Sequence, residues 1–191
     1  MSIGGRRTGI ILAVALTVGI LGGNNLLAAD QNTVRRYPIP GQGILELNTP
    51  SSWQDQVHRQ QEKMPHTLIF RPASGADFEI TLIVAWNKKG EKGFNSADTI
   101  RTKLQEESKK LMGKIKESTI PLQGIKGTNT TGYFISVTDN VPEPGEYRYM
   151  TRASVGVGTL LLNATILHRV KESDTVKDAL SMLRDARQVA K

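Results

Sequence analysis

The stretch GEYRYMTRASVGVGTLLLNATILHRV, residues 145–170, decides the fold that this sequence predicts. Side chains alternate along it, and two glycines interrupt the alternation near its middle, which is typical of a β-hairpin. We place a two-residue turn at Val157 and Gly158, because glycine suits the backbone of a tight hairpin turn. This turn sets the register of the strands and pairs Val155 with Leu160, Ala153 with Leu162, and Tyr149 with Ile166.

The two faces of this hairpin differ in polarity. We expect the apolar face to pack on the core; it carries Tyr149, Ala153, Val155, Leu160, Leu162 and Ile166. On the mixed face Arg148 and Arg152 are four residues apart and point the same way, and the register puts Asn163 beside Arg152. If a helix covers this face, the arginines must be paired and are structural. If they reach solvent, Arg148, Arg152 and Asn163 form a small cationic patch that contacts a carboxylate-bearing partner.

The rest of the chain predicts further strands and two helices. We expect strands in residues 44–48, 66–72, 77–86, 114–119, 120–127 and 130–139, with a flexible tail over 30–36. A first helix begins at Asn95 or Ser96 and runs to about Gly113. A second helix is capped by Ser173 or Asp174. Its apolar stripe consists of Val176, Ala179, Leu180, Leu183 and Ala186.

Together with the hairpin, the segment YPIPGQGILELNTPSSW (residues 37–53) and the segment GYFISVTD (residues 132–139) carry a family resemblance. The order is a tyrosine, a glycine turn, a short apolar strand and Pro-x-x-Trp at Pro50 and Trp53. Strands at 68–71 and 78–86, a helix, the hairpin and a terminal helix follow. In this order of elements the chain resembles an exported bacterial member of the PsbP-like superfamily. That superfamily takes its name from an extrinsic photosystem II subunit and shares its fold with a Ran-binding nuclear import factor.

The resemblance implies an α+β fold in which helices flank an antiparallel β-sheet, an αβα sandwich formed by a single domain over residues 37–191. It also implies a noncatalytic binding or assembly protein. No residues here match a metal or cofactor motif, so we expect neither a metal nor a cofactor. From the net positive charge of the chain we predict a protein partner, and we favour an acidic one.

The N-terminus predicts export. Arg6 and Arg7 precede a short apolar run and a cleavage region of small residues that ends at Ala29. This order is typical of a cleaved signal peptide over residues 1–29. The apolar run is shorter than the roughly 20 residues of a membrane-spanning helix. Cleavage after Ala29 would give a periplasmic or secreted chain and lower the formal charge from +7 to +5. The 38% hydrophobic and 23% charged residues suit one globular domain, and the chain contains no cysteine.

One alternative from another class is a metal-dependent hydrolase of the cell envelope that uses His58, His66 and the acidic loop at Asp139. The histidines lack the spacing of a zinc hydrolase helix, and we expect both to be ordinary exposed residues. We place His168 on the apolar side of its strand, opposite Tyr147.

Basic residues are concentrated between Lys88 and Lys126, where they outnumber acidic residues about two to one. Nucleic-acid binders interleave aromatic residues with such a run, and this run has only Phe94, so we expect no nucleic-acid partner. A solvated helix face is favoured, and an anionic membrane surface stays open as a second partner. The oligomeric state is left open. Trp53 and Trp86 are predicted to close the core rather than to bind a ligand.

Overall fold

The computed structural model describes residues 31–58, 65–87 and 90–190. The predicted signal peptide, residues 1–29, lies outside this range, so its cleavage stays a prediction. No helix among the described residues is long and apolar enough to cross a membrane.

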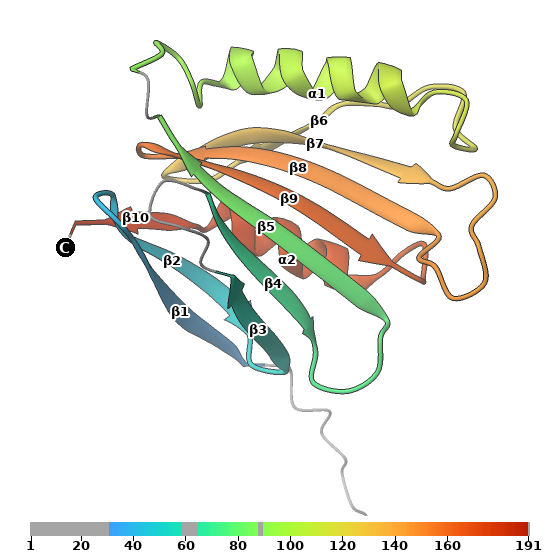
Figure 1. Ribbon diagram of the computed structural model, residues 1–191, viewed down its shortest axis with the longest axis horizontal. Coiled ribbons are helices and arrows are strands. Elements are labelled where there is room, and N and C mark those ends of the chain that lie inside the picture. The colour runs from blue at the N-terminus through green and yellow to red at the C-terminus, as the bar shows by residue number, and fades with distance from the viewer. Residues whose placement is uncertain (1–30, 59–64, 88–89, 191) are drawn as a thin grey trace, which may run out of the picture.

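A seven-stranded antiparallel sheet forms the middle layer (Figure 1). Its strands lie in the order β3 (Trp53–His58), β4 (His66–Pro72), β5 (Phe78–Trp86), β9 (Leu160–His168), β8 (Tyr149–Val157), β7 (Thr130–Thr138) and β6 (Gln123–Lys126). The strands β4, β5, β8 and β9 carry buried apolar side chains at alternate positions, which is what one buried sheet face requires.

Helix α1 (Ala97–Leu111) covers one face of this sheet over β7 and β8 (Figure 1). Ser96 caps it, since the Ser96 side chain accepts a hydrogen bond from the backbone N–H of Thr99 at 3.3 Å. Ile100 and Leu104 of the helix and Leu161 of β9 form a small buried cluster. The lysine-rich sides of α1 are thereby left in solvent.

The opposite face holds the main core, which is closed by a second layer (Figure 1). This layer consists of helix α2 (Asp174–Arg184), capped by Ser173, and a three-stranded sheet. The small sheet has the order β1 (Asn32–Ile39), β2 (Gly43–Pro50) and β10 (Arg187–Val189). The expected α+β arrangement of an antiparallel sheet flanked by helices is therefore confirmed, with a small second sheet beside α2.

The hairpin of β8 and β9 forms where the sequence placed it, but its register differs by two residues. The turn consists of Gly158 and Thr159, and Val157 pairs with Leu160. Gly158 has a φ of 55°, a left-handed conformation that glycine adopts without steric cost. Because a shift of two residues preserves the side of the sheet on which each side chain lies, the predicted apolar face is still correct. Five of its six residues belong to the buried core, namely Ala153, Val155, Leu160, Leu162 and Ile166, and Tyr149 is half-buried.

The flexible tail predicted over residues 30–36 is wrong from Asn32 onward. Residues 32–36 form the first half of β1 and pair with β2 through their backbones. Arg35 donates to the carboxylate of Asp55 and to the carbonyl of Trp53, and the Tyr37 hydroxyl donates to Asp55 at 2.9 Å. These hydrogen bonds connect β1 to β3 and stabilise the polar residues 32–36 as part of an edge strand.

Candidate functional site

The three residues predicted to contact a partner do not form one patch. Arg152 pairs with Thr165 of β9, and Asn163 pairs with Ser154, so the predicted pairing of Arg152 with Asn163 is wrong. The two-residue register shift is the reason, since the turn lies at Gly158 and Thr159.

Each of the three has its own surroundings. The guanidinium of Arg152 lies 3.1 Å from the carboxylate of Glu107 on α1, and the arginine side chain is 38% exposed. The Asn163 side chain accepts a hydrogen bond from the Ser154 hydroxyl at 2.7 Å. Arg148 lies just before β8 and is exposed at the end of the sheet. Their role as partner contacts stays a prediction, and Arg148 lines a hollow of the surface.

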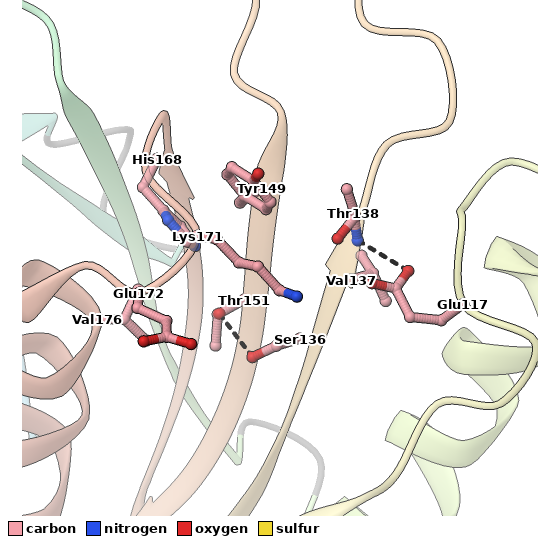
Figure 2. A pocket seen from close by; sticks show the side chains of 10 residues that line it. All are labelled: Glu117, Ser136, Val137, Thr138, Tyr149, Thr151, His168, Lys171, Glu172 and Val176. Carbon is pink, nitrogen blue, oxygen red and sulfur yellow. Dashed lines mark hydrogen bonds between the residues drawn. The ribbon is translucent and has the colours of Figure 1, made fainter.

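That hollow is part of a depression at the end of the sheet where β7 and β9 end and β8 begins. We call it the sheet-end groove. Its outer hollow has a volume of about 520 Å³ and is lined by Lys116, Glu117, Thr138, Arg148, Tyr149 and Lys171. Its inner pocket has a volume of about 240 Å³ and lies at the α2 side. The inner pocket is lined by Glu117, Ser136, Val137, Thr138, Tyr149, Thr151, His168, Lys171, Glu172 and Val176 (Figure 2). Since four residues line both parts, the groove is continuous.

Glu117 forms one wall of the groove (Figure 2). Its carboxylate accepts a hydrogen bond from the backbone N–H of Thr138 at 2.9 Å. Partial desolvation raises the pKa of Glu117, but hydrogen bonds from Thr138 and the ammonium of Lys171 more than offset this and hold the pKa below its usual value. Glu117 is therefore a fixed negative charge that is already hydrogen-bonded.

His168 and Tyr149 form the back of the inner pocket. Their rings stack with centroids 5.4 Å apart and an interplanar angle of 23°. The Nδ1 of His168 donates to the carbonyl of Val170, because a carbonyl can only accept, and the two atoms are 2.7 Å apart. Burial lowers the pKa of His168, although the bond to Val170 opposes this shift. His168 is thus neutral at pH 7 and acts as an aromatic wall.

Three cations surround the outer hollow. Lys116 precedes Glu117, Arg148 precedes β8, and Lys171 follows β9, so three separate segments supply the charges. All three side chains belong to exposed residues. Within the described part of the chain, none of the ion pairs involves Lys116, Arg148 or Lys171. The outer hollow therefore offers cationic groups to a ligand.

The residues of the alternative hydrolase site do not meet. His58 is exposed at the end of β3, whereas His66 is buried in β4 with its ring 6.0 Å from that of Trp86. The expectation that His66 is exposed is therefore wrong, because His66 is the first residue of β4 and its side chain lies on the same buried face as Leu68 and Phe70. Asp139 follows β7, and three strands separate β7 from β4, which is roughly 19 Å at about 4.8 Å per strand. Among the described residues, no group of three or more His, Asp or Glu side chains is arranged to hold a metal ion.

Sequence reasoning missed most of the groove. It singled out Arg148 and placed His168 on the apolar side, which is correct, although His168 lies opposite Tyr149 rather than Tyr147. Glu117 and Lys171 come from loops whose mutual position no local pattern reveals. The signal that could have pointed to them is the antiparallel order of the strands, since the end of β7, the start of β8 and the end of β9 must lie side by side.

Comparisons with known proteins bear on the fold. No protein-family model matches the chain, and no curated protein matches it. Fifteen chains of solved structures match. The solution structure of cyanobacterial PsbP (CyanoP) from Synechocystis sp. PCC 6803 is 14% identical and has a TM-score of 0.52, covering 90% of this chain and 100% of that chain. A crystal structure from Bacteroides thetaiotaomicron VPI-5482 at 1.50 Å resolution is 16% identical with a TM-score of 0.52, covering 77% of this chain and 46% of that chain. The chain has a PsbP-like fold, as the sequence resemblance implied.

Proposed function

We propose that this PsbP-like chain is an exported, noncatalytic binding protein that docks an acidic segment of a protein partner in the sheet-end groove. One observation carries the proposal: Lys116, Arg148 and Lys171 converge on a single hollow from three separate segments. The noncatalytic, accessory role follows from the resemblance found in the sequence. Export follows from the leader-like residues 1–29.

The shape of the groove favours a protein segment over a membrane. A flat anionic surface contacts groups that protrude, whereas these cations surround a hollow of about 520 Å³. An extended acidic segment can enter such a hollow and place carboxylates against several cations at once. Glu117 weakens the attraction but does not cancel it, because three cations and only one carboxylate line the outer hollow.

A defined probe tests the proposal. The probe is a dye-labelled peptide of eight glutamates, and its binding is followed by fluorescence anisotropy at low and at physiological salt. The triple variant Lys116→Gln, Arg148→Gln, Lys171→Gln should bind about tenfold more weakly, at roughly 0.5 kcal/mol for each exposed ion pair that is lost. The loss should shrink as salt rises, because salt screens exposed charges.

A control variant separates the groove from net charge. Lys92→Gln, Arg101→Gln, Lys103→Gln also removes three positive charges, but from the loop before α1 and the first half of α1. That end of the molecule lies at the opposite end of β8, where Asn95 donates hydrogen bonds to the carbonyls of Gly158 and Leu160. The control should bind the peptide within about twofold of the wild type.

Two results would overturn the proposal. An equal loss in both triple variants would mean that net charge alone attracts the peptide. Binding to phosphatidylglycerol vesicles without any binding to the peptide would identify a membrane surface as the partner.

A further inference from the structure

We infer that the inner pocket of the sheet-end groove receives one apolar side chain of the docked segment, so that the partner carries an apolar residue beside its acidic residues. This inference rests on the proposed function and specifies the chemistry of its partner. It starts from the two parts of the groove, which differ in what they offer.

Two of the hydroxyl groups that line the inner pocket are already engaged. The hydroxyls of Ser136 and Thr151 lie 2.8 Å apart and hydrogen-bond to each other (Figure 2). The Nδ1 of His168 is bonded to the carbonyl of Val170. Among the described residues, no buried side-chain nitrogen or oxygen lacks a partner. An apolar group can therefore enter without leaving one of these polar groups unpaired.

Apolar surfaces complete the inner pocket. Val176 of α2 lines it on one side, and the ring of Tyr149, stacked on His168, lines it from β8. The stacking fixes the position of the tyrosine ring, so the wall is present before a ligand arrives. Contact with these surfaces would remove apolar area of the ligand from water, which is the main source of affinity at an anchor position.

Charge keeps acidic side chains out of this part. Glu117 and Glu172 both line the inner pocket, and Figure 2 shows Glu172 and Glu117 on opposite sides of it. Lys171 lines the pocket as well and would oppose a cationic side chain. In the outer hollow the balance is reversed, with three cations and one carboxylate. Acidic residues of the partner therefore belong in the outer hollow and a neutral residue in the inner pocket.

The size of the inner pocket fits a side chain. Its volume of about 240 Å³ is below the roughly 300–1,000 Å³ of typical small-molecule pockets. An apolar anchor surrounded by a charged, solvent-accessible rim is also the usual anatomy of a protein-binding hot spot. Glu117, Thr138, Tyr149 and Lys171 line both parts, so the apolar residue must lie within a few residues of the acidic ones.

Two labelled peptides test the inference by anisotropy. They are Glu-Glu-Gly-Leu-Gly-Glu-Glu and the same peptide with glycine in place of leucine. The leucine peptide should bind the wild type roughly tenfold more tightly, as expected from partial burial of one leucine side chain. The variant Val176→Phe fills the pocket, so it should bring the affinities of the two peptides within about twofold of each other.

The matched control is Val34→Phe, which adds the same bulk to a residue that is 58% exposed on β1. It should preserve the preference for leucine. In addition, NMR with a leucine peptide labelled at its methyl groups should show contacts with Val176 and Tyr149 of the wild-type protein. This measurement decides the matter even if Val176→Phe does not fold.

The outcomes separate the two claims. If both peptides bind the wild type equally, the inner pocket takes no anchor, while the proposed docking of acidic segments stands. A leucine preference that survives in Val176→Phe, or methyl contacts elsewhere, would also overturn the inference. If neither peptide binds, the proposed function fails and the inference fails with it.

Discussion

Replacing Trp53 by alanine tests whether the core closes as described. Trp53 is the first residue of the edge strand β3 and is only 5% exposed. Its ring lies 5.1 Å from that of Phe78 and 6.2 Å from that of Phe70, measured between centroids, and both pairs are tilted. The side chain thus packs against Phe70 of β4 and Phe78 of β5 in the main core, as the sequence predicted.

The expected cost is about 3 kcal/mol. Truncating a buried Phe or Trp to alanine costs roughly 3–5 kcal/mol, because apolar contact is lost and a cavity remains. The lower end applies here because β3 lies at the edge of the sheet, where the neighbouring chain can partly collapse into the gap. Two aromatic pairs are lost in addition to apolar area, so a much smaller cost is not expected.

Urea unfolding followed by far-ultraviolet circular dichroism measures this cost. With a slope of about 2 kcal/mol per molar urea, the midpoint should fall by roughly 1.5 M. Val57→Ala is the matched control on the same strand, because Val57 is 37% exposed and should cost less than about 0.5 kcal/mol. A loss below about 1 kcal/mol for Trp53→Ala would refute this description of the core and return Trp53 to the candidates for ligand contact.

Two further predictions concern acid stability and export. Burial lowers the pKa of His168 in the folded chain, so the unfolded chain binds a proton first as pH falls. Neutral His168 contributes its full stabilisation above pH 6.5, its ordinary pKa, and this contribution is lost as the pH falls through the lower pKa of His168 in the folded chain. Glu117 does not titrate in this range, because its pKa lies below the ordinary value of 4.5. Urea unfolding at pH 7 and pH 5.5 should show a smaller pH dependence for His168→Gln, and an unchanged slope would contradict the assignment. For export, mass spectrometry of the chain from its native host should show a start near Asp30, and a membrane-bound chain that retains Met1 would reverse the localisation argument.

Much of the main sheet could be predicted because its strands carry their own pattern. The side-chain period of a strand is two residues, so the apolar face of the hairpin was identified correctly even though its turn lies one residue later than predicted. Both helices likewise begin at residues named from the sequence, Ser96 and Ser173 serving as N-caps. In these elements local chemistry and tertiary packing agree.

The two edge strands of the small sheet, β1 and β10, could not be predicted because their own side chains give little sign of a strand. β1 includes a polar run and is held by backbone pairing with β2 and by the contacts of Arg35 and Tyr37 with Asp55. β10 has only three residues, and its Gln188 is held by hydrogen bonds to the carbonyl of Gln42 and the backbone N–H of Thr159. Gln188 of β10 reaches partners 29 and 146 residues away, and the Arg35 and Tyr37 contacts of β1 reach Asp55 across 20 and 18 residues, so no short local window contains these partners.

The same distinction explains why the partner-contact residues were only partly foreseen. Arg148 and Arg152 carry the same charge, and their separation of four residues predicts the same face of the strand for both, yet their surroundings differ. A partner carboxylate at Arg152 must displace the carboxylate of Glu107, so it gains only the difference between two exposed ion pairs, each worth about 0–1 kcal/mol. Arg148 forms no ion pair within the described residues and faces the hollow that Lys116 and Lys171 share. A carboxylate there displaces no ion pair of Arg148 and meets three cations against one lining carboxylate, that of Glu117. The end of the sheet, rather than its helix-covered face, is therefore the place where an acidic partner gains most.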